Sequence, residues 1–407
     1  MLTPEQFERS EPLPSFTVPA DRLWIGDLDV GPADIPASFD DNWSIVLQLG
    51  SFVSTSKAPS LEMSAAVQLQ GSEERMELLV TRQSFSFDED RLTIEARPAR
   101  QPMVLVASPS AVSFKAVLLS PPDFIKKPIN LVAADQHEYC LTPFASHTTG
   151  GCFLSSNQKT HASDPLQPLE TIRYFLTFMK GSNCGLGNLH AYDSSGEIAY
   201  RLLGFSKDDR PAKRETNWFD IEIQNDLPAI FDRFSKSMED KTTNQALCQA
   251  INFYRASNAS REVSLEMAII AAHSSLEAIV NYILASQACW SKSLMAERSI
   301  SFSDKLRAAA GFYRLDCDIL TYSPALIELS KKRSGLDAYV IISFIRNKLV
   351  HQDAKYTPTG IELHEAWLIA QWLVEVLIFG VIGYSGKMID RRVYRGWRGT
   401  TCTIPTT

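Results

Sequence analysis

The sequence predicts an α+β protein in which a β-rich, sandwich-like N-terminal domain is followed by an all-α helical bundle. Short strand-like runs separated by turn residues fill about the first 160 residues, and apolar residues at helical spacing dominate from about residue 227. A chain of 407 residues suits two or three domains of roughly 100–200 residues each. We expect a β-rich sensing or regulatory domain (1–165), a connecting helix and hairpin (166–226), and a helical domain with a basic C-terminal tail (227–407).

The N-terminal domain is predicted from seven runs rich in Val, Ile, Leu and Phe, at the close spacing typical of an antiparallel sandwich or barrel. These runs are Trp43–Leu49, Ala65–Gln70, Met76–Thr81, Arg91–Ala96, Val104–Ala107, Val112–Leu119 and Asn130–Ala133. The polar segment 155–167 is expected to be a loop or boundary. Residues 168–181 predict a helix, because Pro168 suits a first turn and Gly181 suits the position after the last turn. Residues 185–205 then predict a hairpin that turns at 193–196.

The helical domain is predicted from six segments in which apolar residues recur with a period near 3.6. These segments are Ala246–Ala256, Ser264–Ser286, Ser303–Phe312, Ser323–Ser330, Asp337–Leu349 and Leu363–Phe379. A β-rich half followed by a helical half indicates two segregated layers or domains.

The charge balance excludes a protein coated in basic charge, because 40 Lys and Arg face 47 Asp and Glu and the net charge is −7. It does not exclude nucleic acid, because binding requires only a local basic patch. The seven cysteines form no C-x-x-C pair, and the N-terminus has neither a basic nor an apolar signal region. We therefore expect reduced thiols and a cytoplasmic protein.

The apolar stretch 366–384 is 19 residues long, close to the ~20 needed to span a bilayer. Gln371 and Glu375 are four residues apart and therefore share one helical face, with His364 on the same stripe. A polar stripe is typical of a buried amphipathic helix in a bundle. We expect no membrane span, and a membrane-associated effector is the alternative.

The segment RNKLVH (346–351) closes an apolar helix and places Arg346, Asn347 and His351 at one helix end. Such a trio suits cleavage of an RNA phosphodiester by its own 2′-OH. A histidine supplies a proton donor or acceptor near neutral pH, and a guanidinium stabilises charge on the reacting phosphate. The alternative is a helix C-terminus where cationic side chains only interact with the helix dipole.

This region resembles the HEPN superfamily, whose R-N-x-x-x-H motif ends a bundle helix. Residues from about 168 to 390 are similar to abortive-infection HEPN proteins of the ApeA type. The similar segments, in order, are TIRYFLTFMKG, NFYRASN (252–258), SLEMAIIAAHSSLEAIVNYIL (264–284), the motif itself and the closing helix 363–379. The first 160 residues match that family only in being β-rich.

The resemblance implies a metal-independent endoribonuclease that needs no cofactor and acts in antiphage defence, abortive infection or as a toxin. It also implies a homodimer through the helical domain, an RNA substrate, and a phage-derived trigger sensed by the N-terminal domain. Arg346 would bind the scissile phosphate, His351 would act as general acid or base, and Asn347 would position the substrate or the partner histidine. The alternative is a non-catalytic HEPN dimerisation or interaction module.

Three further groups of residues are candidates for supporting the motif, contacting RNA or binding a metal. Glu277 lies with His273 and Asn281 on a polar stripe of helix 264–286, and we expect it to hold Arg346 in place, the alternative being a solvent-facing stripe. Positive side chains expected to contact RNA are Lys348, Arg391, Arg392 and Arg395. The last three lie in an aromatic-rich tail, and the alternative is that this tail is only a solvated basic terminus. The histidines and cysteines of 137–161 have no common zinc-finger spacing, so no metal is expected.

Overall fold

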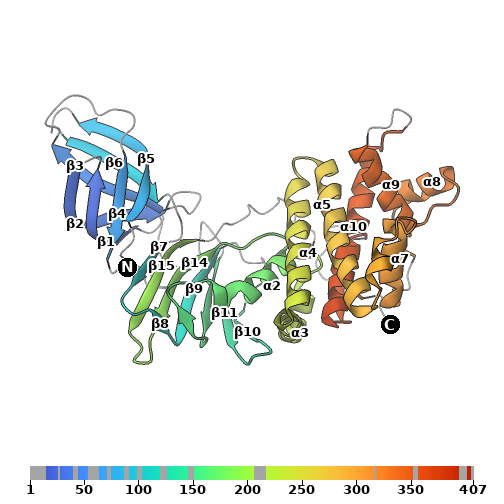
Figure 1. Ribbon diagram of the computed structural model, residues 1–407, viewed down its shortest axis with the longest axis horizontal. Coiled ribbons are helices and arrows are strands. Elements are labelled where there is room, and N and C mark those ends of the chain that lie inside the picture. The colour runs from blue at the N-terminus through green and yellow to red at the C-terminus, as the bar shows by residue number, and fades with distance from the viewer. Residues whose placement is uncertain are drawn as a thin grey trace.

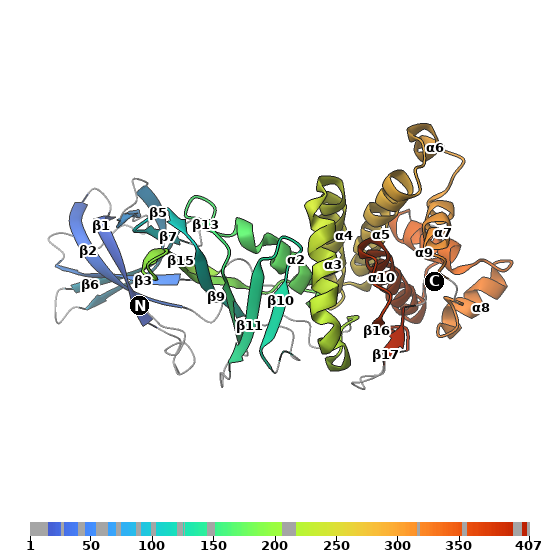
Figure 2. The same ribbon diagram turned by 90° about the horizontal axis from the view of Figure 1, so that it is seen from below.

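The computed structural model describes residues 15–25, 28–39, 45–53, 64–70, 75–86, 91–98, 103–119, 125, 127–144, 151–205, 217–315, 318–351, 356–393 and 401–404. It confirms the α+β class: strands make up the N-terminal part and helices the C-terminal part (Figure 1). A barrel, a second sheet and a helical bundle follow one another along the molecule, and the view from below shows the same order (Figure 2).

The first unit is a closed six-stranded barrel rather than a sandwich, with strand order β1-β2-β3-β6-β5-β4. Its strands are β1 (Ser15–Ile25), β2 (Leu28–Phe39), β3 (Ile45–Val53), β4 (Ala65–Leu69), β5 (Arg75–Ser86) and β6 (Arg91–Pro98). Alternate residues point inward, as Ile45, Leu47 and Leu49 do on β3, and form the barrel core. Closure removes unpaired strand edges from this unit.

The second unit is an antiparallel seven-stranded sheet with order β10-β11-β12-β9-β14-β15-β7. Its strands are β7 (Met103–Val106), β9 (Ser113–Leu119), β10 (Ile129–Val132), β11 (Glu138–Phe144), β12 (Gly151–Ser156), β14 (Leu186–Tyr192) and β15 (Ile198–Phe205). The short strands β8 (Ser110–Ala111) and β13 (Thr160–His161) pair beside it. The predicted hairpin is confirmed as β14 and β15, and it belongs to this sheet.

One face of this sheet packs on helices. α2 (Glu170–Lys180) follows the 3-10 turn η1 (Gln167–Leu169) and ends at Gly181, whose φ of 80° is the left-handed conformation predicted for that position. α3 (Leu227–Glu239) follows η2 (Ile221–Asp226). Phe175 of α2 and Phe231 of α3 pack together with ring centroids 5.0 Å apart. The sheet and the bundle therefore share one continuous apolar core.

The bundle consists of α4 (Lys241–Ser260), α5 (Leu265–Tyr282) with its π-helical extension η3 (Ile283–Gln287), α6 (Lys292–Ala296), α7 (Phe302–Phe312), α8 (Pro324–Lys332), α9 (Ala338–Val350) and α10 (Gly360–Ile382). All six predicted helical segments are confirmed. Residues after α10 form β16 (Lys387–Ile389), which pairs with β17 (Thr401–Thr403).

α10 is the central helix of the bundle and packs against α4, α5, α8 and α9. Two helical stretches, Leu265–Gln287 and Gly360–Ile382, are long and apolar enough to cross a membrane by length and composition. The most apolar windows of these two stretches are 56% and 89% buried inside the protein, as in core helices. The stretch 366–384 is therefore packed within the bundle.

Candidate functional site at the end of α9

α9 positions the R-N-x-x-x-H motif through its apolar face. Asp337 caps the start of the helix, and its side chain accepts a hydrogen bond from the Val340 amide at 2.9 Å. Ala338, Ile341, Ile342 and Ile345 recur at helical spacing and are buried, so the remaining faces of the last turn are left for polar side chains. The His351 amide still donates to the Asn347 carbonyl at 2.9 Å, so the helical path continues to the motif histidine.

The motif side chains differ in exposure and in partners. Asn347 and His351 are exposed, whereas Arg346 and Lys348 are partly buried. Arg346 Nη1 donates to Asn347 Oδ1 at 3.2 Å, and Arg346 Nε is buried without a hydrogen-bond partner. Asn347 therefore holds a guanidinium that keeps donor capacity for another group, and the exposed imidazole stands one turn further along the same face.

Glu277 lies in the electrostatic range of Arg346, but its direct contact is His273. The His273 Nδ1 and Glu277 Oε1 atoms are 3.3 Å apart; the histidine side chain is 4% exposed and the glutamate 41%. The interaction with His273 lowers the pKa of Glu277 against the effect of burial, and the charge of Arg346 adds to the lowering. Among the described residues no ion pair joins Glu277 to Arg346. The expected support of Arg346 by Glu277 is therefore an electrostatic attraction over a distance and not a direct contact.

Beside the motif lies a basic aromatic cluster that the sequence analysis missed, formed by Arg333, Phe344, Lys348 and Tyr356. The Arg333 guanidinium carbon lies 5.1 Å from the Phe344 ring centre and 4.9 Å from that of Tyr356. Lys348 Nζ lies 5.3 Å from the same Phe344 ring. Phe344, Lys348 and His351 share one helical face because they are spaced i, i+4, i+7. That spacing could have indicated Phe344 and Lys348 in the sequence, whereas Arg333 and Tyr356 lie outside α9 and join the cluster only through the fold.

The structure corrects the expected role of the C-terminal tail. Arg391 side chain is 0% exposed and binds the equally buried carboxylate of Glu375 through Nη2 at 2.5 Å and Nε at 3.2 Å. Arg392 is 6% exposed, binds Asp390 at 2.6 Å and lies over the Trp372 ring at 3.7 Å. Neither side chain is available to an RNA strand in this arrangement, because each is enclosed by the bundle. Arg395 lies outside the described residues.

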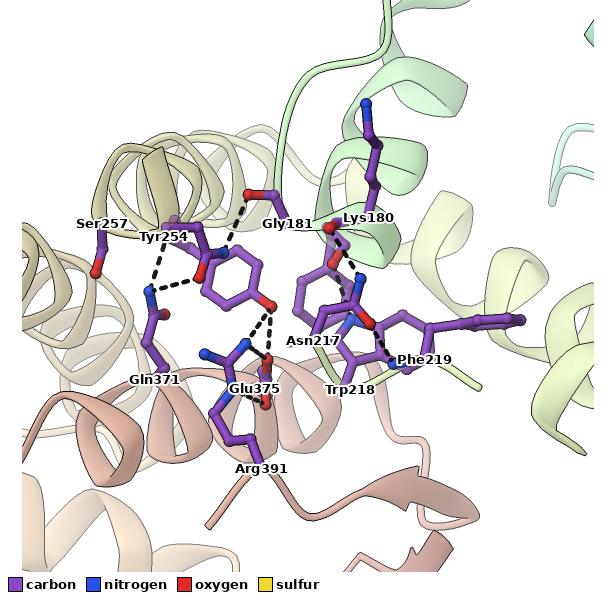
Figure 3. A network of polar contacts seen from close by, with 12 residues as sticks. Lys180, Gly181, Asn217, Trp218, Phe219, Tyr254, Ser257, Gln371, Glu375 and Arg391 are labelled. Carbon is purple, nitrogen blue, oxygen red and sulfur yellow. Dashed lines mark hydrogen bonds and ion pairs between the residues drawn. The ribbon is translucent and has the colours of Figure 1, made fainter. Parts of the chain in front are cut away.

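Arg391 belongs to a buried polar network between α4, α10 and the tail (Figure 3). Tyr254 donates to Glu375 Oε1 at 2.5 Å, and Arg391 Nη2 donates to the Tyr254 oxygen at 3.1 Å. Burial lowers the pKa of Arg391, but the Glu375 carboxylate and Tyr254 outweigh it, so that pKa lies above its ordinary value. The polar stripe of Gln371 and Glu375 is thereby explained: both side chains face partners inside the protein.

The same network reaches the end of α2. Gln371 Nε2 donates to the Asn258 side-chain oxygen at 3.2 Å, and Asn258 Nδ2 donates to the Gly181 carbonyl at 3.0 Å. A Cβ on Gly181 would lie 2.7 Å from Asn258 Nδ2, so glycine is needed both for its φ and for this approach. The NFYRASN segment therefore contributes Tyr254 and Asn258 to structure.

The histidines and cysteines of 137–161 do not converge where they are described. His137 Nδ1 lies 2.7 Å from Asp135, His161 contacts Ser163, and Cys152 is buried in the core. His147 lies outside the described residues. Within the described part of the chain, no three His, Cys, Asp or Glu side chains form a group that would hold a metal ion.

The helical half is similar in sequence to one family and to one prophage protein. Residues 240–402, from the start of α4 to β17, match the family model described as the YopA C-terminal domain. Over 238 residues the chain is 22% identical to the SPbeta prophage-derived uncharacterized protein YopA of Bacillus subtilis (strain 168), covering 58% of this chain and 52% of that protein. The chain thus spans about half the length of the curated relative it matches. No solved structure matches it.

Proposed function

We propose that this protein is a metal-independent endoribonuclease of the HEPN type, acting in the cytoplasm in antiphage defence or abortive infection. The observation that carries the proposal is the end of α9. There, Arg346 is held by Asn347 and keeps a buried unpartnered Nε, and an exposed His351 stands one turn away. A guanidinium with free donor capacity beside a titratable imidazole is the minimum equipment for internal transesterification of RNA.

In the proposed reaction the ribose 2′-oxygen attacks the adjacent phosphorus and loses its proton to a base. The 5′-oxygen leaves with a proton from an acid, giving a 2′,3′-cyclic phosphate and a 5′-hydroxyl end. His351 serves as one of these proton-transfer groups, and the Arg346 guanidinium stabilises the charge that develops on the nonbridging oxygens. Asn347 orients Arg346 and lies exposed beside the substrate position.

A second copy of the chain would supply the second proton-transfer group. A two-fold axis beside the α9 ends would bring two motifs together, since an isologous interface repeats each residue across the axis. Apolar side chains near this rim favour such an interface: Val263, Val350 and Ile361 are exposed at the α4–α5 turn, the end of α9 and the start of α10. The same apolar rim would serve the alternative function, a non-catalytic dimerisation or interaction module.

RNA would approach the motif along the basic aromatic cluster rather than along the tail. Lys348 and Arg333 present cationic groups, and Phe344 and Tyr356 present ring faces that suit base stacking. The net charge of −7 makes such a local path necessary, because the general field of the protein repels a polyanion.

The experiment is incubation of the purified full chain with total RNA in EDTA, beside His351→Ala and Arg346→Ala. Wild type should leave 2′,3′-cyclic phosphate ends, and both variants should lose cleavage while keeping their circular dichroism spectra. Arg298→Ala, an exposed arginine elsewhere in the bundle, is the matched control. Cleavage that survives both substitutions contradicts the mechanism. A dimeric wild type that cleaves no RNA, with or without phage lysate, supports the interaction module instead.

A further inference from the structure

The seven-stranded sheet carries a polar row on the face opposite α2 and α3. Residues paired in register across six neighbouring strands have their side chains on the same face. The pairs run Asn130↔Cys140, Cys140↔Ser155, Ser155↔Lys115, Lys115↔His190 and His190↔Arg201. Neither the strands' own hydrogen bonding nor the helix-side core requires polar side chains at these positions.

The barrel covers one end of this face and leaves the other end hollowed. Val117, Phe153 and Leu203 lie on it and pack with the barrel core. Further along the same strands lies a groove of about 440 Å³, within the range of small-molecule sites. It is lined by polar and aromatic side chains of five strands and the segment after β12, among them Lys115, Asn130, Glu138, Asn157 and Tyr192.

Three nitrogen-bearing side chains stand next to one another beside this groove. Lys115, His190 and Arg201 occupy adjacent strands β9, β14 and β15, and Lys115 lines the groove itself. His190 is 8% exposed, and its Nε2 is buried without a hydrogen-bond partner. Arg201 Nε is likewise buried and unpartnered. Buried nitrogens without a hydrogen-bond partner are uncommon in folded proteins and call for a partner group.

The charges around these side chains indicate whether the partner group is positive or negative. Among the described residues no carboxylate forms an ion pair with Lys115 or Arg201, and the one carboxylate of the groove lining, Glu138, is on β11, two strands from Lys115. Burial and the neighbouring Arg201 charge lower the pKa of His190 to about 4, so the imidazole is neutral at pH 7 between two cations. An anion seated on this row would lie beside the two unpartnered nitrogens of His190 and Arg201 and beside the exposed ammonium group of Lys115.

We propose that this face binds a small phosphate-bearing ligand, with the phosphate on Lys115, His190 and Arg201 and the remainder in the groove. A phosphate offers oxygens to three separate donors, whereas a carboxylate offers two oxygens in one plane. The ring of Tyr192, paired with Ser113 next to the Lys115↔His190 pair, stands where the attached group would lie. The amide side chains of Asn130 and Asn157 line the groove and supply hydrogen bonds for that group.

The test is isothermal titration of the full chain with inorganic phosphate, adenosine monophosphate, adenosine and succinate. Both phosphate-bearing probes should bind, and adenosine and succinate should not; tighter binding of the nucleotide than of inorganic phosphate identifies the source as a nucleotide. Lys115→Ala should weaken binding by roughly tenfold or more, the loss of a charged hydrogen bond. Arg201→Gln provides a second variant, and Lys159→Ala, an exposed lysine of the same unit, should change nothing.

The proposal is overturned if neither phosphate-bearing probe binds at millimolar concentration, if succinate binds as well as phosphate, or if Lys115→Ala binds like wild type. None of these readouts depends on RNA cleavage.

Discussion

The buried position of Arg391 makes a prediction that separates a structural tail from an RNA-binding tail. Arg391→Met keeps the length of the side chain and removes its charge, leaving the Glu375 carboxylate in the core with Tyr254 as its remaining partner. Because both charged side chains are 0% exposed and joined by two hydrogen bonds, the cost is that of breaking a buried pair, about 3–5 kcal/mol. A surface pair would be worth about 0–1 kcal/mol.

The assay is urea unfolding followed by tryptophan fluorescence, with Lys387→Met as the control because Lys387 is an exposed cation of the same segment. A double-mutant cycle with Glu375→Leu sharpens the result. Each single variant leaves one buried charge unpaired, whereas the double variant removes both and should recover most of the lost stability. If Arg391→Met costs no more than Lys387→Met, the tail does not lie in the core and the reasoning fails.

Three other predictions concern separate parts of the molecule. Arg333→Ala and Lys348→Ala should each reduce the log–log salt slope of RNA binding by roughly 0.7 in a fluorescence titration; an unchanged slope places the RNA elsewhere. Gly380→Ala should lower stability by about 1–3 kcal/mol in thermal melts, because its Cβ would lie 2.7 Å from the Tyr313 ring; a rise in melting temperature contradicts this packing. Between pH 7 and pH 4 the free energy of unfolding, measured by urea denaturation, should fall by about 3 kcal/mol more for wild type than for His190→Gln. The reason is that burial lowers the pKa of His190 from 6.5 in the unfolded chain to about 4 in the folded protein, so that low pH favours the unfolded state. Equal losses in the two proteins refute the burial of His190 as a neutral group.

The elements that local pattern predicts are those whose signals lie within one segment. The helices show their apolar period, and Gly181 ends α2 because a residue without Cβ is needed there. The barrel was not separable from a sandwich, because closure depends on pairs such as β3 with β6 that lie far apart in the chain. The RNA-contacting role predicted for Arg391 was wrong for the same reason. Its partners Glu375 and Tyr254 are 16 and 137 residues away in the chain, and a local run of Lys and Arg does not indicate either contact.

The polar side chains of α10 also decide how that helix is used. Gln371 Nε2 donates to the Tyr254 carbonyl of α4 at 3.3 Å, and Glu375 forms an ion pair with Arg391 of the tail. Both polar side chains of this apolar stretch therefore have partners inside the protein. For α10 to face lipid, both partners would have to leave it, and a charge in the bilayer centre would itself cost about 2.5–3.5 kcal/mol. A hydropathy average does not reveal these contacts, because it is calculated from residue types alone and contains no information on which residues they contact. The helix that most resembles a membrane span in the sequence thus has buried polar side chains whose partners lie within the bundle and the tail.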